Sequence, residues 1–320
     1  MTFRTLREGD TIAIIAPAGP ADVDRLALVP ALYQSFGLQA RVYPGCHQRS
    51  GYLAGSDDVR LADLHAALAD PDIAAIHCVR GGYGCMRLLD RIGRDLVRSA
   101  AKLLIGYSDI TALHALWARE GLASLHAPMP TSDLLLADPN PAPSAAAAQA
   151  SRHQDRDALF AVLRHGLVAG TPLHAEPATE TAPLRATGRA EGLLIGGNLS
   201  LVAALLGTPW AWNMAGAILF LEDINEEPHR LDRLLTQLRL AGVFDSVAGI
   251  VLGSFTESAC PLELLGEMLL SPCLRRGIPL LGGWPAGHGT PNRPLPLGVR
   301  VRLDADAGHI EVLQGFLQAE

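Results

Sequence analysis

The sequence predicts an α/β protein: an N-terminal doubly wound parallel sheet of the flavodoxin-like type, followed by a second, smaller mixed α/β domain. Residues 1–135 alternate short apolar runs with amphipathic segments, which is the pattern of βαβ units. The second half of the chain mixes strand and helix patterns in irregular order. The chain has 320 residues, 49% of them hydrophobic, which is enough for two cores. We therefore expect domains at 1–135 and 186–320, joined by a linker at 136–185.

Four strands are expected in the first domain, each followed by a turn. They cover Thr11–Ala16, Gln39–Tyr43, Ile73–Val79 and Lys102–Ile105. Helical spacing of apolar residues predicts helices over Asp22–Ser35, Ser56–Ala69 with Ser56 as N-cap, and Ile110–Glu120. Ligands of parallel sheets bind at the carboxyl ends of the strands, so the turns after the third and fourth strands are the candidate site.

The stretch from Thr131 to Arg185 is rich in alanine and proline and shows no strand pattern. A short helix near Asp155–Arg164 is the one element expected in it. Two roles remain open for this stretch, a passive linker or a segment that also covers a site, because composition does not separate them.

The second domain is predicted to hold six strands and a strongly amphipathic helix. The helix covers Pro228–Leu240, with proline in its first turn and Gly242 after its end. The last two strands flank a turn and are expected to form an antiparallel hairpin. The strands cover Glu191–Ile195, Ala217–Leu221, Gly249–Gly253, Ile278–Leu281, Val299–Leu303 and His309–Val312.

Charge and composition argue against several classes of partner. The net charge is −7 and no basic stripe occurs, so neither nucleic acid nor an anionic membrane is an expected partner. No apolar run approaches the ~20 residues of a transmembrane helix, and the N-terminus lacks the layout of a signal peptide. The five cysteines are odd in number and lack paired spacing, which favours a reduced, cytoplasmic protein. Cys85 follows a glycine loop and is either reactive or a small core residue.

Ser108 lies in Gly106-Tyr107-Ser108-Asp109, where a buried strand passes into a helix. A serine on such a turn is held out from the sheet edge, close to the unpaired N–H groups that favour negative charge. An acyl-transfer nucleophile requires this kind of position. The alternative is that Ser108 or Asp109 simply caps the helix, which is the commoner role of these residue types.

A serine nucleophile requires a base, and the base requires an orienting acid. Among the eleven histidines, His288 differs because it lies between two glycines in a non-periodic loop. Its alternative role is that of an ordinary turn residue. Glu222 ends a buried strand, where an unpaired carboxylate would be costly, and a histidine partner would explain its position. Asp223 is the competing acid, with a structural hydrogen-bonding role as its alternative.

An oxyanion hole requires backbone N–H groups that point at one position. The N–H of Asp109, directly after Ser108, is one candidate, and the glycines of Arg80-Gly81-Gly82-Tyr83-Gly84 offer another. This loop lacks the spacing of a Walker A or Rossmann motif. A plain tight turn is its alternative interpretation.

Taken together, these segments resemble the LD-carboxypeptidase family of serine peptidases, which includes murein tetrapeptide carboxypeptidases and microcin immunity carboxypeptidases. The resemblance spans nearly the whole chain, in family order. It rests on Ile15-Ala16-Pro17-Ala18-Gly19, Arg80-Gly81-Gly82-Tyr83-Gly84, Gly106-Tyr107-Ser108-Asp109, Gly196-Gly197-Asn198-Leu199, Leu221-Glu222-Asp223 and Gly287-His288-Gly289.

The resemblance implies Ser108 as nucleophile, His288 as general base and Glu222 as its orienting acid. It also implies an oxyanion hole formed by the backbone N–H groups of Gly82 and Asp109, a mechanism without cofactor or metal, and a homodimer. The implied reaction is hydrolysis of an L,D-peptide bond in a cytoplasmic murein tetrapeptide, with release of C-terminal D-alanine during cell-wall recycling.

Two alternatives to this function remain. A microcin-immunity enzyme would cleave a peptidyl-nucleotide, whose base an aromatic residue could stack on; Thr131–Arg185 contains no Trp or Tyr and only Phe160, which disfavours this. A non-catalytic protein could instead bind an anionic ligand at the glycine loops. Such a binding site has no need for an acid and a histidine at those loops.

Overall fold

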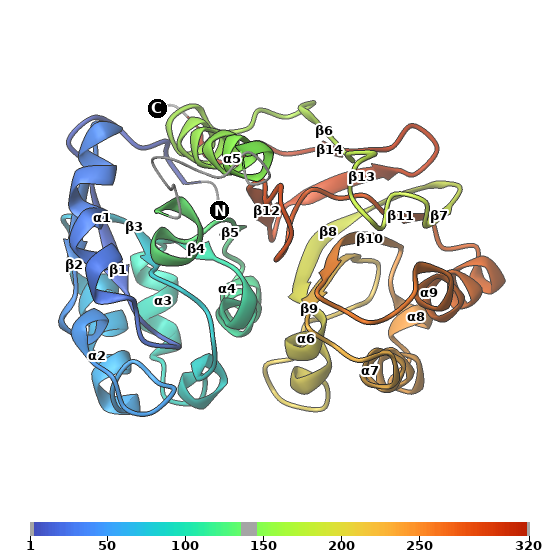
Figure 1. Ribbon diagram of the computed structural model, residues 1–320, viewed down its shortest axis with the longest axis horizontal. Coiled ribbons are helices and arrows are strands. Elements are labelled where there is room, and N and C mark those ends of the chain that lie inside the picture. Colours follow the sequence, from blue (N-terminus) through green and yellow to red (C-terminus); the bar gives the residue numbers. More distant parts are fainter. Residues whose placement is uncertain (1–2, 136–145, 319–320) are drawn as a thin grey trace. The chain divides into compact units, whose positions relative to one another are not determined.

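The computed structural model describes residues 3–135 and 146–318, which form two compact units (Figure 1). The first unit comprises the described chain up to Gly166, together with Arg293–Pro296 and the C-terminal segment from Leu317. The second unit comprises Leu167–Asn292 and Leu297–Phe316. Each unit has its own sheet.

The sheet of the first unit has six strands in the order β12-β5-β4-β3-β1-β2. Strands β1 to β5 pair in parallel, and their order 2-1-3-4-5 is that of flavodoxin-like sheets, so the predicted fold class is confirmed. The strands cover Thr11–Ile15 (β1), Gln39–Val42 (β2), Ile73–Cys78 (β3), Leu103–Gly106 (β4), Ser124–His126 (β5) and Leu295–Leu297 (β12).

Helices α2 and α4 pack against strands of this sheet. The α2 helix contacts β1 and β3, and α4 contacts β4 and β5. Ser56 caps α2 as predicted, since its Oγ accepts a hydrogen bond from the N–H of Val59 at 3.3 Å. The helices cover Val23–Ser35 (α1), Asp57–Ala69 (α2), Arg94–Ala100 (α3), Thr111–Arg119 (α4) and Ala146–His165 (α5). Short helical turns cover Pro44–His47 (η1), Cys85–Leu88 (η2), Ser108–Ile110 (η3) and Pro130–Leu134 (η4).

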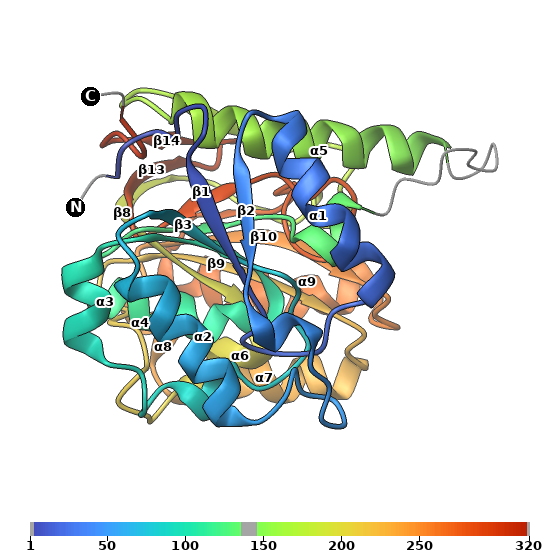
Figure 2. The same ribbon diagram turned by 90° about the vertical axis from the view of Figure 1, so that its left-hand side faces the viewer.

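The α5 helix is much longer than the short helix predicted at Asp155–Arg164. It runs for 20 residues and is the long green helix of Figure 2. Its first half lies in the alanine- and proline-rich stretch that was expected to be a linker or a segment covering a site. Alanine has the highest helix propensity of all residues, which accounts for the longer helix. The proline-rich residues 136–145 lie outside the described part of the chain.

The second unit contains a mixed sheet of eight strands in the order β6-β14-β13-β8-β9-β10-β11-β7. Strands β8 to β11 pair in parallel, whereas β6, β7, β13 and β14 pair antiparallel. The predicted hairpin of β13 and β14 is confirmed. The strands cover Pro172–His174 (β6), Arg185–Ala186 (β7), Arg189–Asn198 (β8), Ile218–Ile224 (β9), Gly249–Thr256 (β10), Leu280–Leu281 (β11), Arg300–Asp304 (β13) and His309–Val312 (β14).

The amphipathic helix predicted at Pro228–Leu240 is α7, and it has the predicted bounds. It buries Leu231, Leu235 and Leu238 on one face. A second long helix, α9, was not predicted. The remaining helices cover Leu199–Leu205 (α6), Val243–Ser246 (α8) and Leu262–Arg276 (α9).

Candidate active site

Ser108 lies in the first unit, on the turn between β4 and α4. Its φ angle is +63°, in the left-handed region that non-glycine residues rarely adopt. Such a conformation costs on the order of 1–3 kcal/mol and recurs at functional sites. The N-cap position of α4 is Ile110 and no side chain caps this helix. Helix capping therefore does not account for the position of Ser108.

The glycine loop after β3 lies directly against Ser108. A Cβ atom on Gly81 would lie 2.7 Å from Cβ of Ser108, 2.9 Å from its Oγ and 3.4 Å from the backbone N of Asp109. The N–H of Gly19, in the turn after β1, donates to the carbonyl of Gly81 at 3.0 Å. Backbone from two strand ends thus packs around the serine, and only glycine leaves the necessary space.

The side chain of Asp109 links this turn to the following part of the glycine loop. Its carboxylate is buried and accepts a hydrogen bond from the N–H of Cys85 at 2.8 Å. Burial raises the pKa of Asp109 above its usual value. The side chain of Asp109 therefore has a structural role, and its backbone N–H remains the candidate donor of an oxyanion hole.

Two groups that the sequence did not single out support the serine turn from behind. His114 on α4 contacts the carbonyl of Gly106 through Nε2 at 2.8 Å and Oγ of Ser124 through Nδ1 at 2.8 Å. Burial lowers the pKa of His114 to about 3. The hydroxyl of Tyr107, next to the serine, donates to Asp133 at 2.9 Å.

His288 and Glu222 lie together in the second unit. Nδ1 of His288 is 2.7 Å from Oε2 of Glu222, whose side chain is 0% exposed. Glu222 lies on β9, and His288 lies in the loop that follows β11. This bond engages Nδ1, so base chemistry at this imidazole would fall to Nε2.

Backbone contacts hold the His288 loop against Glu222. A Cβ atom on Gly287 would lie 2.8 Å from Oε2 of Glu222, so a larger residue would force the pair apart. The N–H of Gly289 donates to Oγ of Ser254 at 2.8 Å, and that of Gly287 donates to Oδ1 of Asn292 at 3.1 Å. Sequence reasoning missed Ser254, because a serine inside a strand carries no chemical signature.

Asp223, the competing acid, has a structural environment. Its carboxylate accepts hydrogen bonds from Asn198 Nδ2 at 2.8 Å, from the N–H and Oγ of Ser200, and from the N–H of Ile224. These contacts join β9 to the start of α6. Successive residues of a strand point to opposite faces, so Glu222 faces His288 while Asp223 faces the α6 terminus.

Two further groups with reactive side chains, His77 and Cys85, are buried. His77 contacts the Tyr33 hydroxyl at 2.5 Å and the carbonyl of Pro128 at 2.9 Å, and burial lowers its pKa to about 3. Cys85 is a buried core residue, and its burial raises the pKa of the thiol well above its usual value. Within residues 3–135 and 146–318, no group of three His, Cys, Asp or Glu side chains could hold a metal ion.

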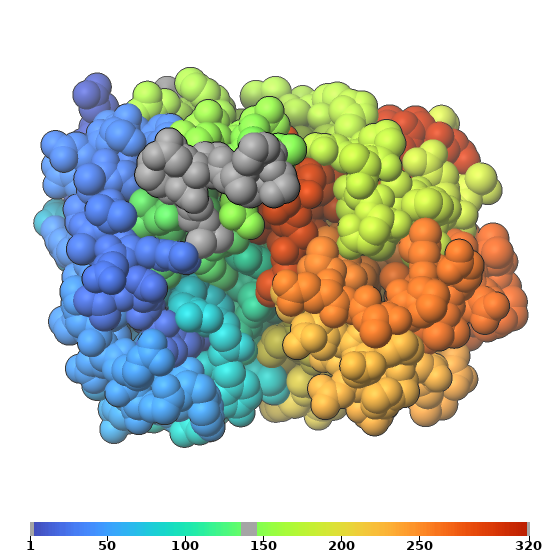
Figure 3. Space-filling view, viewed as in Figure 1, coloured from blue at the N-terminus to red at the C-terminus, as the bar shows by residue number. Residues whose placement is uncertain are grey.

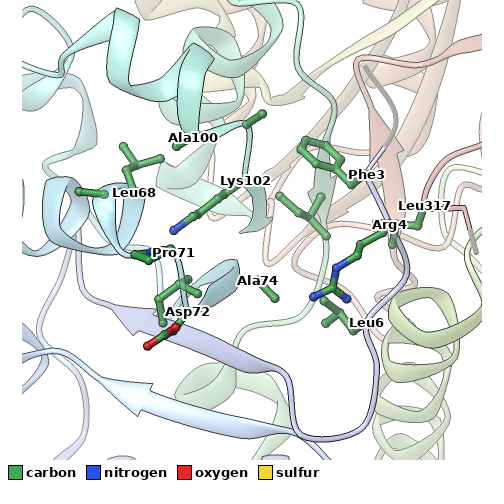
Figure 4. Close-up of a pocket in the computed structure, with 14 residues that line it drawn as sticks. Phe3, Arg4, Leu6, Leu68, Pro71, Asp72, Ala74, Ala100, Lys102 and Leu317 are labelled. Atoms are coloured by element: carbon green, nitrogen blue, oxygen red, sulfur yellow. The ribbon is translucent and has the colours of Figure 1, made fainter. Parts of the chain in front are cut away.

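Two hollows in the structure are lined by none of these site residues. A cavity of about 580 Å³ lies in the first unit near the start of β3 and β4 (Figure 4). Ser108 follows the other end of β4. Lys102 reaches into the cavity, but its ammonium donates to the carbonyls of Ala67 and Asp70 at the end of α2, which explains its burial. In the second unit, a groove of about 450 Å³ lies between the segment around Leu184 and α9, where yellow-green atoms adjoin orange atoms in Figure 3.

Comparison with known proteins places this geometry in a family. The model of the LD-carboxypeptidase N-terminal domain matches residues 12–127, and that of the C-terminal domain matches residues 191–303. The chain belongs to the LD-carboxypeptidase family. It is accordingly a carboxypeptidase, and the family suggested by the sequence motifs is confirmed.

Named relatives agree with this assignment. A probable murein peptide carboxypeptidase of Bacillus subtilis is 36% identical over 94% of this chain and 91% of its own length. The murein tetrapeptide carboxypeptidase of Pseudomonas aeruginosa is 35% identical, over 92% of this chain and 93% of its own length. The microcin C7 self-immunity protein MccF of Escherichia coli is 28% identical, over 98% and 96%.

Solved structures of family members have the same fold. MccF in complex with glutamyl sulfamoyl guanosine has a TM-score of 0.84 at 25% identity and covers 99% of each chain. The muramoyltetrapeptide carboxypeptidase of Oxalobacter formigenes has a TM-score of 0.77 at 29% identity, over 96% of this chain and 100% of the other. No helix among the described residues is both long and apolar enough to span a membrane.

Proposed function

We propose that this carboxypeptidase is of the serine type and releases C-terminal D-alanine from cytoplasmic murein tetrapeptides during cell-wall recycling. The observation that carries the proposal is the 2.7 Å bond between the imidazole of His288 and the fully buried carboxylate of Glu222. A histidine held in this way has one ring nitrogen oriented by an acid and the other assigned to proton transfer. The names of the relatives from B. subtilis and P. aeruginosa support a murein peptide as substrate.

In the proposed mechanism, Oγ of Ser108 attacks the carbonyl carbon of the L,D-peptide bond while Nε2 of His288 takes the hydroxyl proton. The mechanism requires the nucleophile-bearing domain, 1–135, and the domain with the acid and histidine, 186–320, to bring these two side chains within hydrogen-bond reach. The carbonyl oxygen becomes an oxyanion that accepts hydrogen bonds from the N–H groups of Gly82 and Asp109. Each such donor is worth about 3 kcal/mol in comparable sites.

The tetrahedral intermediate then collapses, and His288 gives its proton to the leaving amine of D-alanine. A water molecule, deprotonated by His288, attacks the ester formed on Ser108; the ester bond then breaks, His288 returns the proton to Oγ of Ser108, and the shortened peptide leaves. Glu222 stays ionised throughout and stabilises the imidazolium that forms in each half of the cycle. All transferred protons are carried by protein groups and water, so the reaction needs no cofactor.

Replacing the proposed nucleophile tests this assignment. Ser108→Ala should abolish D-alanine release from purified murein tetrapeptide, and a serine-directed fluorophosphonate should label the wild type at Ser108 but not the variant. Ser99→Ala, on the exposed surface of α3, is the matched control and should leave release unchanged. Near-normal turnover by Ser108→Ala would refute a serine mechanism, whereas D-alanine release by neither protein would refute the substrate.

Aromatic side chains bear on a second substrate class, peptidyl-nucleotides: one of them is not available to a nucleotide base, but an exposed pair favours this class. Phe160 is buried and stacks on Phe36, with ring centroids 3.8 Å apart, so it is not available to a nucleotide base. However, Tyr83 in the glycine loop and Tyr52 are both exposed and form an edge-to-face pair at 5.6 Å. Such a pair could stack on a base, and MccF has been solved with aspartyl sulfamoyl adenosine.

Kinetics on both substrates would choose between these two proposals. The ratio of kcat/KM for murein tetrapeptide to that for an aminoacyl sulfamoyl adenosine should exceed one if murein recycling is the function. Tyr83→Leu should reduce turnover of the nucleotide more than turnover of the tetrapeptide if stacking occurs.

The family resemblance also supports the proposal of a homodimer. Light scattering of the purified chain tests it.

A further inference from the structure

A carboxypeptidase must distinguish the end of a peptide from an internal bond. The difference at the end is a free carboxylate, one residue beyond the bond that is cut. A fixed cation close to the nucleophile would recognise that carboxylate, and arginine is well suited because its planar fork matches the two oxygens. Such a cation would lie beside Ser108 and have no acidic partner within the protein.

Arg80 meets this description. It lies just beyond the end of β3 and directly precedes Gly81, the residue whose backbone packs against Ser108. Its Nη1 donates to the carbonyl of Pro20 at 3.2 Å. Its Nε is buried and has no hydrogen-bond partner within residues 3–135 and 146–318. A buried donor on a charged group is costly to leave without an acceptor, so this edge of the guanidinium calls for an explanation.

The unpartnered edge of Arg80 lies beside the proposed oxyanion hole. A Cβ atom on Gly19 would lie 3.6 Å from Nε of Arg80 and 3.7 Å from Cα of Gly82. Nε of Arg80 and the backbone of Gly82 therefore flank the same glycine. The same Cβ would lie 2.9 Å from the carbonyl oxygen of Gly81, so the backbone of Gly19 packs closely against the glycine loop and fixes Arg80 beside it.

Arg60 also has a buried Nε without a hydrogen-bond partner among the described residues, but carboxylates already bind Arg60 and Arg87. Arg60 is fully buried, pairs with Asp57, and also donates to the carbonyl of Pro17. Arg87 pairs with the same Asp57 through Nε and Nη2, at 3.0 and 2.9 Å. Among the described residues, no carboxylate pairs with Arg80.

We propose that Arg80 binds the terminal carboxylate of the substrate and so restricts cleavage to the last peptide bond. The proposal rests on the proposed serine carboxypeptidase function and adds the group that selects the chain end. Nη1 donates to the carbonyl of Pro20 and anchors the guanidinium, while the Nε–Nη2 edge donates hydrogen bonds to the carboxylate. The terminal carboxylate would then bind close to the proposed oxyanion hole, because Arg80 directly precedes the glycines of that loop.

The alternative role for Arg80 is to brace the two loops through its bond to Pro20. A brace would affect every substrate equally, whereas a carboxylate-binding residue would affect only substrates with a free C-terminal acid. The two roles are therefore separated by a substrate pair, murein tetrapeptide ending in D-alanine and the same peptide ending in D-alaninamide.

The experiment measures kcat/KM for both peptides with the wild type, Arg80→Met and Arg80→Lys. The wild type should prefer the acid over the amide by about 10- to 100-fold, the usual range for a hydrogen-bonded charge. Arg80→Met should lose this preference through a decrease on the acid alone. Arg80→Lys keeps the charge without the fork and should retain part of the preference. Arg87→Met, which removes a nearby arginine bound to Asp57, should change neither value.

The outcomes distinguish the inference from the function beneath it. If the wild type releases no D-alanine from the acid, the proposed function is wrong. If the wild type is active but has no preference for the acid, or if Arg80→Met and Arg80→Lys reduce both substrates equally, Arg80 does not bind the carboxylate. Thermal unfolding of each variant identifies any loss that arises from a destabilised fold.

Discussion

Gly81 is the position where one added carbon should impair the candidate site most directly. In Gly81→Ala, the new Cβ would lie 2.7 Å from Cβ of Ser108 and 2.9 Å from its Oγ. Carbon atoms in contact are normally about 3.5–4.0 Å apart, so the serine and the glycine loop must separate by roughly 0.8 Å. Gly81 is not among the glycines with positive φ, so the added contact, rather than backbone strain, is the perturbation.

The expected result follows from the precision that catalysis requires. A displacement of about 1 Å at a reacting group costs on the order of 100-fold in rate, so kcat for D-alanine release should fall by roughly that factor. Overpacking should lower the free energy of unfolding by only about 1–3 kcal/mol, which leaves the variant folded. The assay is steady-state release of D-alanine from murein tetrapeptide, together with urea unfolding of the same preparation.

Gly93→Ala serves as the control for Gly81→Ala. Its added Cβ would make only an ordinary contact, 3.6 Å from Cβ of Leu96, and its φ is −65°. It should leave kcat within about twofold, with a small loss of stability because alanine is a poor N-cap. If Gly81→Ala retained the kcat of the wild type while remaining folded, the serine would not need its observed position.

The remaining predictions concern an acid and a buried histidine. Glu222→Gln should lower kcat by about 10³- to 10⁴-fold, because the amide can donate to Nδ1 of His288 and select the wrong tautomer; Glu226→Gln, a nearby acid bound by Ser200, is the control for D-alanine release. His114 has a folded pKa of about 3 against an ordinary value of 6.5, so its contribution to stability is complete above pH 6.5 and is lost as the pH falls toward 3. The wild type should therefore lose up to about 5 kcal/mol of unfolding free energy from this group over that range, and His114→Asn should show a correspondingly weaker pH dependence in urea titrations.

Each of these two predictions would be contradicted by one specific result. A Glu222→Gln enzyme with the turnover of the wild type would mean that the carboxylate does not orient the base. Equal pH dependence of unfolding in the wild type and in His114→Asn would mean that His114 is not held neutral by burial.

The alternating pattern of the first unit was predictable because each of its elements carries its own local signals. The α2 helix has a serine cap and two acidic residues in its first turn, and it was found at the predicted bounds. The α9 helix was missed because it contains Gly266 and Pro272, which oppose helix formation locally. It packs against α7, α8 and β7, so tertiary contacts stabilise it, and single-sequence patterns do not contain that information.

The bounds of β8 were also too short in the prediction. The strand was expected to end at Ile195 before two glycines, yet it continues to Asn198. A Cβ atom on Gly196 would overlap the carbonyl oxygen of Phe220 on the neighbouring strand β9. Glycine here marks a close approach of two strands rather than a turn, and local sequence does not distinguish these uses.

The candidate acid could be narrowed to two neighbours from the sequence but not to one. Glu222 and Asp223 are adjacent on β9, and alternation guarantees that they face opposite sides of the sheet. Which side faces His288 depends on the pairing of β9 with β8 and β10 and on the path of the loop after β11. That information lies in the tertiary structure, which is why the sequence left both acids open.

Both halves of the candidate site share one structural device, a glycine whose missing side chain leaves room for a functional one. A Cβ atom on Gly81 would collide with Ser108 in the first unit, and a Cβ atom on Gly287 would collide with Glu222 in the second. In each case glycine backbone lies directly against the functional side chain. Backbone has fewer alternative conformations than a side chain, so it fixes the position of Ser108 or Glu222 with little loss of entropy. Activity should therefore be sensitive to an alanine at either glycine, although neither glycine carries a reacting group.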